Sequence, residues 1–424
     1  MSGRAFPVSR KAGRPFLSFS MDSVRIGMSK QMKTKLFVIL FLAAAVTAAG
    51  GTFSLSLNQH SARNLFQTSI PVSDQISSFS LFWSEDSAGL SFLSEAQYSF
   101  FHQNTALSFG SLSLGFDYLK PSGEKSAFYF AAGGSGTLFR SEYSAFGSLS
   151  FNLLGAFKTY LSPTSIMKIQ WRGDFWTYRD SLFDFLSQVA SFSVDKFFQT
   201  RTTVKGEASW KYKHFLHPFL DVPTEPLASM ALASSGGMGS GGGGPRYQGG
   251  NGFIPVYRPG GGGTGIHNAS LSLLIAQGLG DKIGLSLSGL RQWNISGENP
   301  FLSIEEFYLV NNPSSDEFSW EGWAGNSLLT IMLPGDIELK VGYTYSDKDF
   351  PGIEVLTAEG EPTGIPRADK RHIVEGRLEK SFPRFTVFLA YSRIDNRSND
   401  PLFTWESPTF LGGIEWSLPM GRKE

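Results

Sequence analysis

Residues 201–213, Arg-Thr-Thr-Val-Lys-Gly-Glu-Ala-Ser-Trp-Lys-Tyr-Lys, alternate strictly between two kinds of side chain. One set of alternate positions is apolar or small and consists of Val204, Gly206, Ala208, Trp210 and Tyr212. The other set carries the charged and hydroxyl residues. A β-strand places the two sets on opposite faces, whereas a helix would scatter the charges around its circumference. The stretch is therefore predicted to be a strand with one apolar and one polar face.

The same period of two recurs along the chain, for example in 166–175, 336–346 and 409–418. An apolar face of this kind also suits the core of a soluble β-sandwich. The predicted strands are, however, roughly 10–16 residues long, against about 5–6 in soluble sheets. That length, when tilted, spans the hydrocarbon layer of a membrane if the barrel is closed and every backbone group is paired.

Aromatic side chains stand near the ends of many predicted apolar faces. In membrane barrels, such residues form girdles at the two interfaces of the bilayer. We therefore expect a lipid-facing girdle that comprises Trp83, Phe116, Tyr118, Trp171, Phe198, Trp210, Tyr212, Tyr343, Tyr345 and Trp416.

The connections between predicted strands alternate in length. Short turns are expected near 84–89, 120–125, 161–165, 198–201, 277–282, 333–336 and 382–384. Longer connections lie at about 217–264, 296–318, 347–368 and 396–406. This alternation is typical of outer-membrane barrels, which have short periplasmic turns and long outer loops. It predicts about sixteen antiparallel strands in up-and-down order, the first at 51–59. Fourteen remain possible if 51–72 is a periplasmic arm and another candidate, such as 88–103, is not a separate strand.

The N-terminal part has the pattern of a secretory signal. Lys33 and Lys35 precede an apolar run over 36–46, which small residues follow at 47–50. This order of charge, apolar core and cleavage site predicts export, and a membrane anchor is the alternative. We expect a signal peptide over 32–49, a non-structural or untranslated leader over 1–31, and a barrel over 51–424. The glycine-rich segment 217–264 is expected to be a flexible outer loop, or a folded-in plug.

Composition narrows the partners and the chemistry. The chain has 37 basic and 37 acidic side chains, a balance that argues against nucleic-acid binding. It has no cysteine, so thiolate chemistry and cysteine metal sites are excluded. The glycine runs lack the Gly-Lys-Ser/Thr ending of a phosphate-binding loop, and no nucleophile elbow is present. We expect no cofactor, no metal site and no enzyme activity.

Three further patterns have a functional and a structural interpretation. His214 and His217 are interpreted as interfacial polar residues rather than metal ligands. Asp174, Asp195 and Glu207 are expected to pair with neighbouring bases rather than act as an acid–base pair. An acidic group in and beside the 296–318 loop is interpreted as solvated, with a cation site as the alternative; it comprises Glu305, Glu306, Asp316, Glu317 and Glu321.

The polar faces of the strands predict a wet interior of mixed charge. The expected lumen-lining residues are Lys168, Arg172, Asp174, Arg201, Lys205, Glu207, Lys211, Glu338, Lys340, Arg371, Glu375, Arg377, Glu379 and Glu415. Sixteen strands leave room for an aqueous channel. A lumen with both signs of charge predicts weak selectivity.

The signal, the alternating strands, the girdle and the final strand over 409–418 together resemble those of bacterial outer-membrane β-barrel proteins, in particular porin-like ones. The resemblance covers 51–424. It implies a channel for small polar solutes, or alternatively a structural or surface-display barrel that binds an external ligand through its loops. It also implies outer-membrane lipid, the barrel-assembly machinery and periplasmic chaperones as partners. The last strand departs from the usual assembly signal, because Leu418 replaces a terminal aromatic and six residues follow it.

Overall fold

The computed structural model describes residues 51–87, 89–179, 184–216, 256–257, 265–298, 301–303, 317–357 and 362–420. The predicted leader and signal peptide, and nearly all of the glycine-rich segment, lie outside these residues. Within the described ranges, no helix is long and apolar enough to span a membrane.

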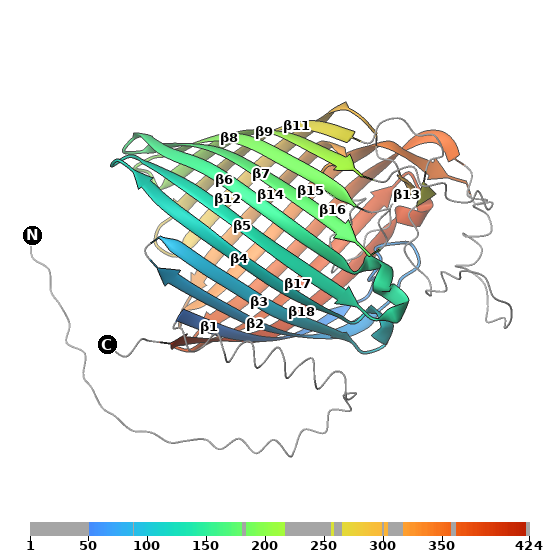
Figure 1. Cartoon of the computed structure of the whole chain (residues 1–424), viewed down its shortest axis with the longest axis horizontal. Helices are drawn as coiled ribbons and strands as arrows, with labels where there is room; N and C mark the ends of the chain where they lie inside the picture. The colour runs from blue at the N-terminus through green and yellow to red at the C-terminus, as the bar shows by residue number, and fades with distance from the viewer. Residues whose placement is uncertain are drawn as a thin grey trace, which may run out of the picture. The chain divides into compact units, whose positions relative to one another are not determined.

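Sixteen antiparallel strands form one closed barrel, in which each strand pairs with its neighbours in the chain (Figure 1). They are β1 Gly51–Ala62, β2 Asp74–Ser87, β3 Leu90–Phe101, β4 Phe109–Ser122, β5 Ser126–Phe139, β6 Ser148–Ser162, β7 Ser165–Tyr178, β8 Phe185–Phe197, β9 Thr202–Phe215, β11 Gly265–Leu279, β12 Ile283–Ser296, β14 Glu321–Leu333, β15 Ile337–Leu356, β16 Pro362–Ser381, β17 Phe385–Ser398 and β18 Trp405–Met420. β1 closes the ring by pairing with β18, from Gly51 opposite Met420 to Ala62 opposite Thr409. The predicted count of sixteen is confirmed, and the alternative of fourteen is wrong because β1 belongs to the wall.

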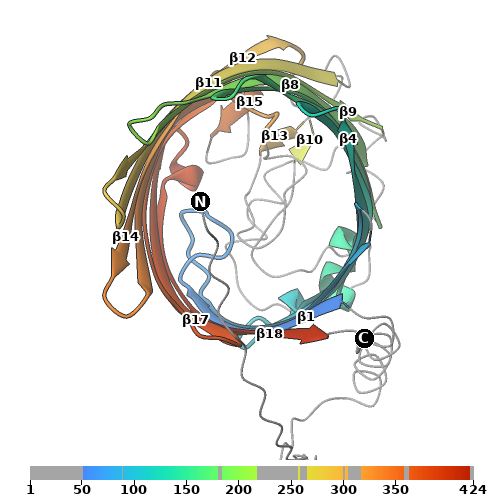
Figure 2. The ribbon, with the colours of Figure 1, turned by 90° about the vertical axis from the view of Figure 1, so that its left-hand side faces the viewer.

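Two very short strands, β10 Val256–Tyr257 and β13 Phe301–Ser303, pair only with each other. Within the described ranges, three short 3₁₀ helices lie in connections between strands: η2 Thr105–Leu107, η3 Ser141–Phe146 and η5 Pro401–Phe403. Figure 2 shows the ring nearly end-on, with the connection that follows β1 lying inside it.

Tight turns join the strands at one end of the barrel, which we call the turn end. All seven turns predicted from the sequence lie there. The turn between β14 and β15 has three residues, 334–336, between the paired Leu333 and Ile337. Two of them, Gly335 and Asp336, have positive φ, 79° and 58°, which lets the chain reverse within so short a loop.

The longer connections lie at the opposite end, which we call the loop end. There one prediction is wrong: 347–368 is not a long loop. β15 and β16 continue as a paired hairpin, in which Phe350 lies opposite Arg367 and Leu356 opposite Pro362. The strands continue because Phe350 and Ile353 are buried, each only 1 % exposed, and therefore favour an ordered backbone.

The alternation of side chains assigns the two faces of the wall. Leucine and aromatic residues cover the outward face and remain exposed, such as Leu114 at 58 % and Leu389 at 64 %. Polar residues occupy most inward positions, and serine hydroxyls pair across strands there, as between Ser56 and Ser80 at 2.7 Å. The barrel thus inverts the usual arrangement of a soluble protein.

Two clusters of buried apolar residues lie at the loop end. One combines residues of the wall with Trp320, Phe350 and Ile353. The other is built around Leu65 and Phe66, which belong to the connection after β1. In both clusters, a connection folds back and packs against inward side chains. The loop end is therefore partly filled.

Candidate functional site

The strand alternation places thirteen of the fourteen expected lumen residues on the inward face. They lie on β7 (Lys168, Arg172, Asp174), β9 (Lys205, Glu207, Lys211), β15 (Glu338, Lys340), β16 (Arg371, Glu375, Arg377, Glu379) and β18 (Glu415). Arg201 is different, because it lies in the turn between β8 and β9 with a φ of 62°. Its guanidinium donates to Asp281 of the neighbouring turn at 2.7 Å, so Arg201 belongs to the rim.

Many inward charges pair within one strand, between positions two residues apart. Lys205 binds Glu207 at 2.7 Å, and Arg377 binds Glu379 at the same distance. Lys340 and Glu338 form a third pair of this kind. Residues i and i+2 share a face of a strand, which explains the spacing. The six side chains remain between 26 % and 40 % exposed, so the inner wall at this level is accessible to water.

A different arrangement binds the segment before β14 to the inner wall near the loop end. The carboxylate of Glu317 accepts from Arg172 at 2.5 Å and is paired with Lys211 at 3.0 Å. Arg172 also donates to Asp174 at 2.9 Å. Glu317 thus bridges β7 and β9 from inside the barrel.

The pKa of Glu317 reflects this position. Burial alone would raise the pKa of this carboxyl, but the ammonium of Lys211 and the guanidinium of Arg172 outweigh burial. Together they hold the pKa below its ordinary value of 4.5. Glu317 is therefore ionised at neutral pH.

Two buried amides fix the backbone of the same segment. Gln292 donates to the carbonyl oxygens of Glu317 at 2.9 Å and Trp320 at 2.6 Å. Asn268 donates to the carbonyl oxygen of Phe318 at 2.7 Å. Both amides are 0 % exposed. We call residues 317–320 with these contacts the inner latch. No pattern in the sequence predicted it, because the contacts join distant strands.

The inner wall around β16 and β17 contains a buried ion pair. Arg367 donates to both carboxylate oxygens of Asp369, at 3.0 and 2.5 Å, and each residue is 1 % exposed. The guanidinium lies 3.5 Å from the centre of the Phe403 ring. Asn396 donates to Asp369 and to the carbonyl oxygen of Phe403. This cluster holds η5 against the wall.

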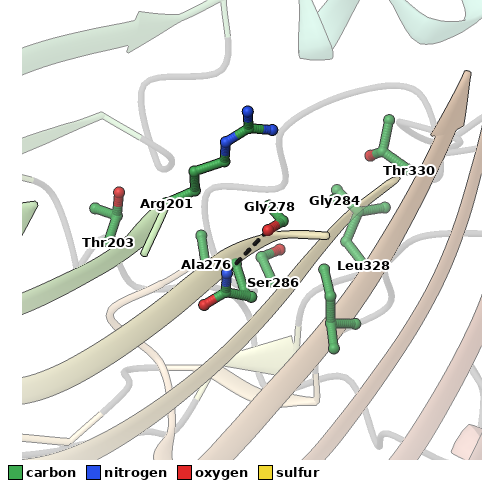
Figure 3. Close-up of a pocket in the computed structure, with 10 residues that line it drawn as sticks. Arg201, Thr203, Ala276, Gly278, Gly284, Ser286, Leu328 and Thr330 are labelled. Carbon is green, nitrogen blue, oxygen red and sulfur yellow. Dashed lines mark hydrogen bonds between the residues drawn. The ribbon is translucent and has the colours of Figure 1, made fainter. Parts of the chain in front are cut away.

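A shallow recess of about 250 Å³ lies in the inner wall near the turn end (Figure 3). Its lining includes Arg201, Thr203, Ala276, Ser286, Leu328 and Thr330, which come from one turn and four strands. No carboxylate lines it.

The expected girdle residues lie at outward positions of the wall, with one exception. Trp83, Tyr118 and Trp416 are toward the turn end, and Trp210 and Tyr212 are toward the loop end, whereas Phe116, Tyr343 and Tyr345 lie near the middle of their strands. Trp171 also faces outward, but it lies near the middle of β7. Phe198 is the exception, because it belongs to the turn before β9.

The predicted acidic group does not come together in the described part of the chain. Glu317 turns inward to the inner latch, whereas Glu321 accepts from the backbone of Asn294 at the outer wall. Glu305, Glu306, Asp316 and His217 lie outside the described residues. Within the described ranges, no cluster of three potential metal ligands is present. Asp174 and Glu207 each pair with a base, as predicted. For Asp195 the prediction is wrong, because it forms no ion pair with a described residue and its buried Oδ1 accepts no hydrogen bond.

No protein-family model matches the chain, and no curated protein matches it. The chain is similar to solved outer-membrane structures from Pseudomonas aeruginosa. Outer membrane protein OprD has 10 % identity and a TM-score of 0.45, over 87 % of this chain and 93 % of that one. OpdO has 10 % identity and a TM-score of 0.42, over 87 % and 96 %. OpdK, solved with vanillate, has 8 % identity and a TM-score of 0.43, over 87 % and 98 %. Similarity at this level is weak, so the function of this chain has to be inferred from its own residues.

Proposed function

We propose that the chain is an outer-membrane channel that passes small polar solutes with weak selectivity. One observation carries the proposal: the ion-paired side chains on the inner wall are about one-third exposed. Inward side chains of a filled barrel are packed against one another and exclude water. Here both signs of charge stand in a wet bore, which favours a hydrated pathway that discriminates little between anions and cations.

The outward face supports the membrane assignment. It exposes long rows of apolar side chains, such as Leu271, Leu273 and Ile275 on β11. Exposure of so large an apolar surface to water would be strongly unfavourable. Outer-membrane lipid is therefore the proposed surrounding. Delivery through a cleaved signal peptide, with periplasmic chaperones and the barrel-assembly machinery as partners, is part of the same proposal.

The decisive experiment is single-channel recording with the purified chain in planar lipid bilayers. We expect discrete conductance steps and a reversal potential near zero in a salt gradient. Lys158 and Lys168 lie opposite each other on the inward faces of β6 and β7, and neither forms an ion pair with another described residue. The double variant K158E/K168E should shift the reversal potential toward cation preference. The absence of steps above baseline would exclude an open channel.

A second candidate function is a closed barrel that displays its loops. The two apolar clusters at the loop end favour it, because they fill part of the bore with folded-in connections. This alternative expects no conductance, and it expects that deletion of 234–263 leaves the barrel folded while removing an external binding activity. Intact folding can be followed by the heat-modifiable mobility of the barrel on a gel.

A further inference from the structure

The outer wall near the loop end changes character between β12 and β18. Toward the turn end, the outward positions of these strands are apolar, as in Ile337, Leu339 and Val341 of β15. Toward the loop end, the outward positions hold ionisable side chains. We call this set the charged band; it consists of Arg291, Glu321, Asp347, Asp349, Lys370, Arg393, Asp395, Arg397 and Glu406.

The strand register makes the charged band continuous. Asp347 lies opposite Lys370, and Lys370 lies opposite Arg397 on the next strand. Asp395 lies opposite Glu406, and Glu321 lies opposite Asp349. Residues that are directly opposite share a face of the sheet. Acidic and basic groups thus form neighbouring rows near the loop ends of β14, β15, β16, β17 and β18.

The contacts within the charged band leave most of its charge open to the surroundings. Arg393 binds Glu406 at 3.0 Å, with the two side chains 53 % and 50 % exposed. Arg397 lies 3.5 Å from Asp395 and is 73 % exposed. Lys370 has no ion-pair partner among the described residues. Such charges are strongly disfavoured against hydrocarbon, so the charged band lies at the level of lipid headgroups.

Tryptophan side chains border the charged band. The Arg291 guanidinium lies 4.9 Å from the ring centre of Trp323 and 5.7 Å from that of Trp293. Both rings are outward and exposed, at 59 % and 41 %. Tryptophan prefers the interface between headgroups and acyl chains. The two rings therefore fix the height of the charged band in the membrane independently of its charges.

The rest of the ring differs from this arc: the outward positions in the loop-end halves of β1–β9 and β11 hold no Asp, Glu, Lys or Arg. On β9 and β11, next to the charged band, the outward positions hold a stack of aromatic rings, in which the ring centre of Tyr212 lies 4.5 Å from that of His267 and 6.1 Å from that of Trp210. A general requirement for solubility at the loop end would place charges around the whole ring. Their restriction to one arc indicates a specific neighbour there.

We propose that the charged band binds the phosphorylated glycolipid headgroup of lipopolysaccharide, together with divalent cations. This proposal rests on the outer-membrane placement within the proposed function, but not on an open pore. Arg393, Arg397 and Lys370 supply charge-assisted hydrogen bonds to phosphate oxygens. The carboxylates of Asp347 and Asp349 contact the same phosphates through Ca²⁺ or Mg²⁺, for which carboxylate oxygens are hard ligands.

A lipid headgroup explains the charged band better than a second copy of the chain. Two copies that met through this arc would bury the exposed ion pairs and would have to desolvate charges of both signs. A headgroup layer keeps them hydrated. The mixture of bases and acids also matches a surface of phosphates that are bridged by cations, whereas an all-basic patch would suit phosphates alone.

The test measures lipid binding to the purified full chain in detergent by native mass spectrometry, with bisphosphorylated lipid A as the probe. The double variant R393Q/R397Q should weaken binding about thirtyfold. The matched control K158Q/K168Q removes two positive charges from the inner wall and should bind like the unaltered chain. Heat-modifiable gel mobility verifies that all variants are folded.

Two further binding measurements identify the chemical groups that the charged band recognises. Dephosphorylated lipid A should bind at least tenfold more weakly, and EDTA should weaken binding of bisphosphorylated lipid A to the unaltered chain. EDTA should have no effect on D347N/D349N, because its bridging carboxylates are removed. Equal binding of phosphatidylglycerol and lipid A would overturn the glycolipid assignment.

The remaining outcomes distinguish a failure of the proposed glycolipid site from a failure of the proposed channel function. Conductance without lipid A binding overturns the glycolipid site and leaves the channel standing. Lipid A binding without conductance supports the site and contradicts the channel. Dissociation of an oligomer by R393Q/R397Q, seen by analytical ultracentrifugation with no change in lipid A binding, would identify the charged band as an interface between copies and overturn the proposal.

Discussion

The carboxylate of Glu317 lies 3.0 Å from the ammonium group of Lys211, and this contact joins the segment before β14 to the inner wall at β9. Lys211 also donates to Gln292 at 2.9 Å, so three separate parts of the chain meet at one buried cation. The contact narrows the bore near the loop end because it keeps residues 317–320 inside the ring. Several measurable properties depend on it.

Removing the charge of Glu317 should loosen the inner latch. In E317Q, Arg172 and Lys211 lose their shared carboxylate, and we expect the free energy of unfolding to fall by about 1–3 kcal/mol. Single-channel records should show a larger mean conductance and more frequent transitions. The control is E321Q, four residues later, whose side chain is at the outer wall. Equal conductance in E317Q and E321Q would contradict a role for the latch in the bore.

Acidification should reproduce the effect of E317Q. The pKa of Glu317 is held below 4.5 in the folded chain, so the stabilising contact is fully present above that value. It is lost as the pH falls through the lowered pKa. Conductance transitions recorded between pH 5 and pH 3, values chosen to bracket roughly this window, should increase toward the acidic end. The E317Q variant should lack the part of this increase that Glu317 causes; an identical pH response in both chains would contradict the assignment.

Breaking the buried pair of Arg367 and Asp369 should be costly. D369N removes the carboxylate that accepts from both Nε and Nη2 of a guanidinium that is 1 % exposed, and we expect a loss of about 3–5 kcal/mol of unfolding free energy. E379Q is a matched change on the same strand, where the pair with Arg377 is partly exposed. It should cost about 1 kcal/mol or less. Urea-dependent unfolding in lipid vesicles, followed by tryptophan fluorescence, compares the unfolding free energies of D369N and E379Q. Similar losses in both variants would show that burial does not set the contribution of an ion pair to stability.

The turn between β14 and β15 provides a test of backbone geometry. Gly335 has a φ of 79°, which an L-residue with a side chain adopts only with strain. G335A should therefore lower stability by about 1–2 kcal/mol. G206A is the control, because a methyl group added at Gly206 meets nothing within 4 Å and the φ there is not positive. It should be neutral or slightly stabilising in the same unfolding assay. If G335A leaves the free energy of unfolding unchanged, the backbone of this turn must adopt a different conformation in the variant.

The sequence by itself determined the barrel and its two faces. In a strand, each side chain meets one of two surroundings in strict alternation, so the pattern of 201–213 is readable without any long-range contact. The same local signal predicted the seven tight turns and placed the inward charges of β7, β9, β15 and β16. It also predicted the pairing of Asp174 and Glu207 with bases.

Only the tertiary structure decided how the loop end is partly filled. Glu317 looked like part of an acidic loop, and it became the partner of Arg172 and Lys211 because the ring brings β7, β9 and the segment before β14 together. The continuation of β15 and β16 past Phe350 has the same cause, since its burial depends on distant aromatic residues. These features rest on contacts between residues that are remote in the chain, and a periodic pattern within one strand carries no information about them.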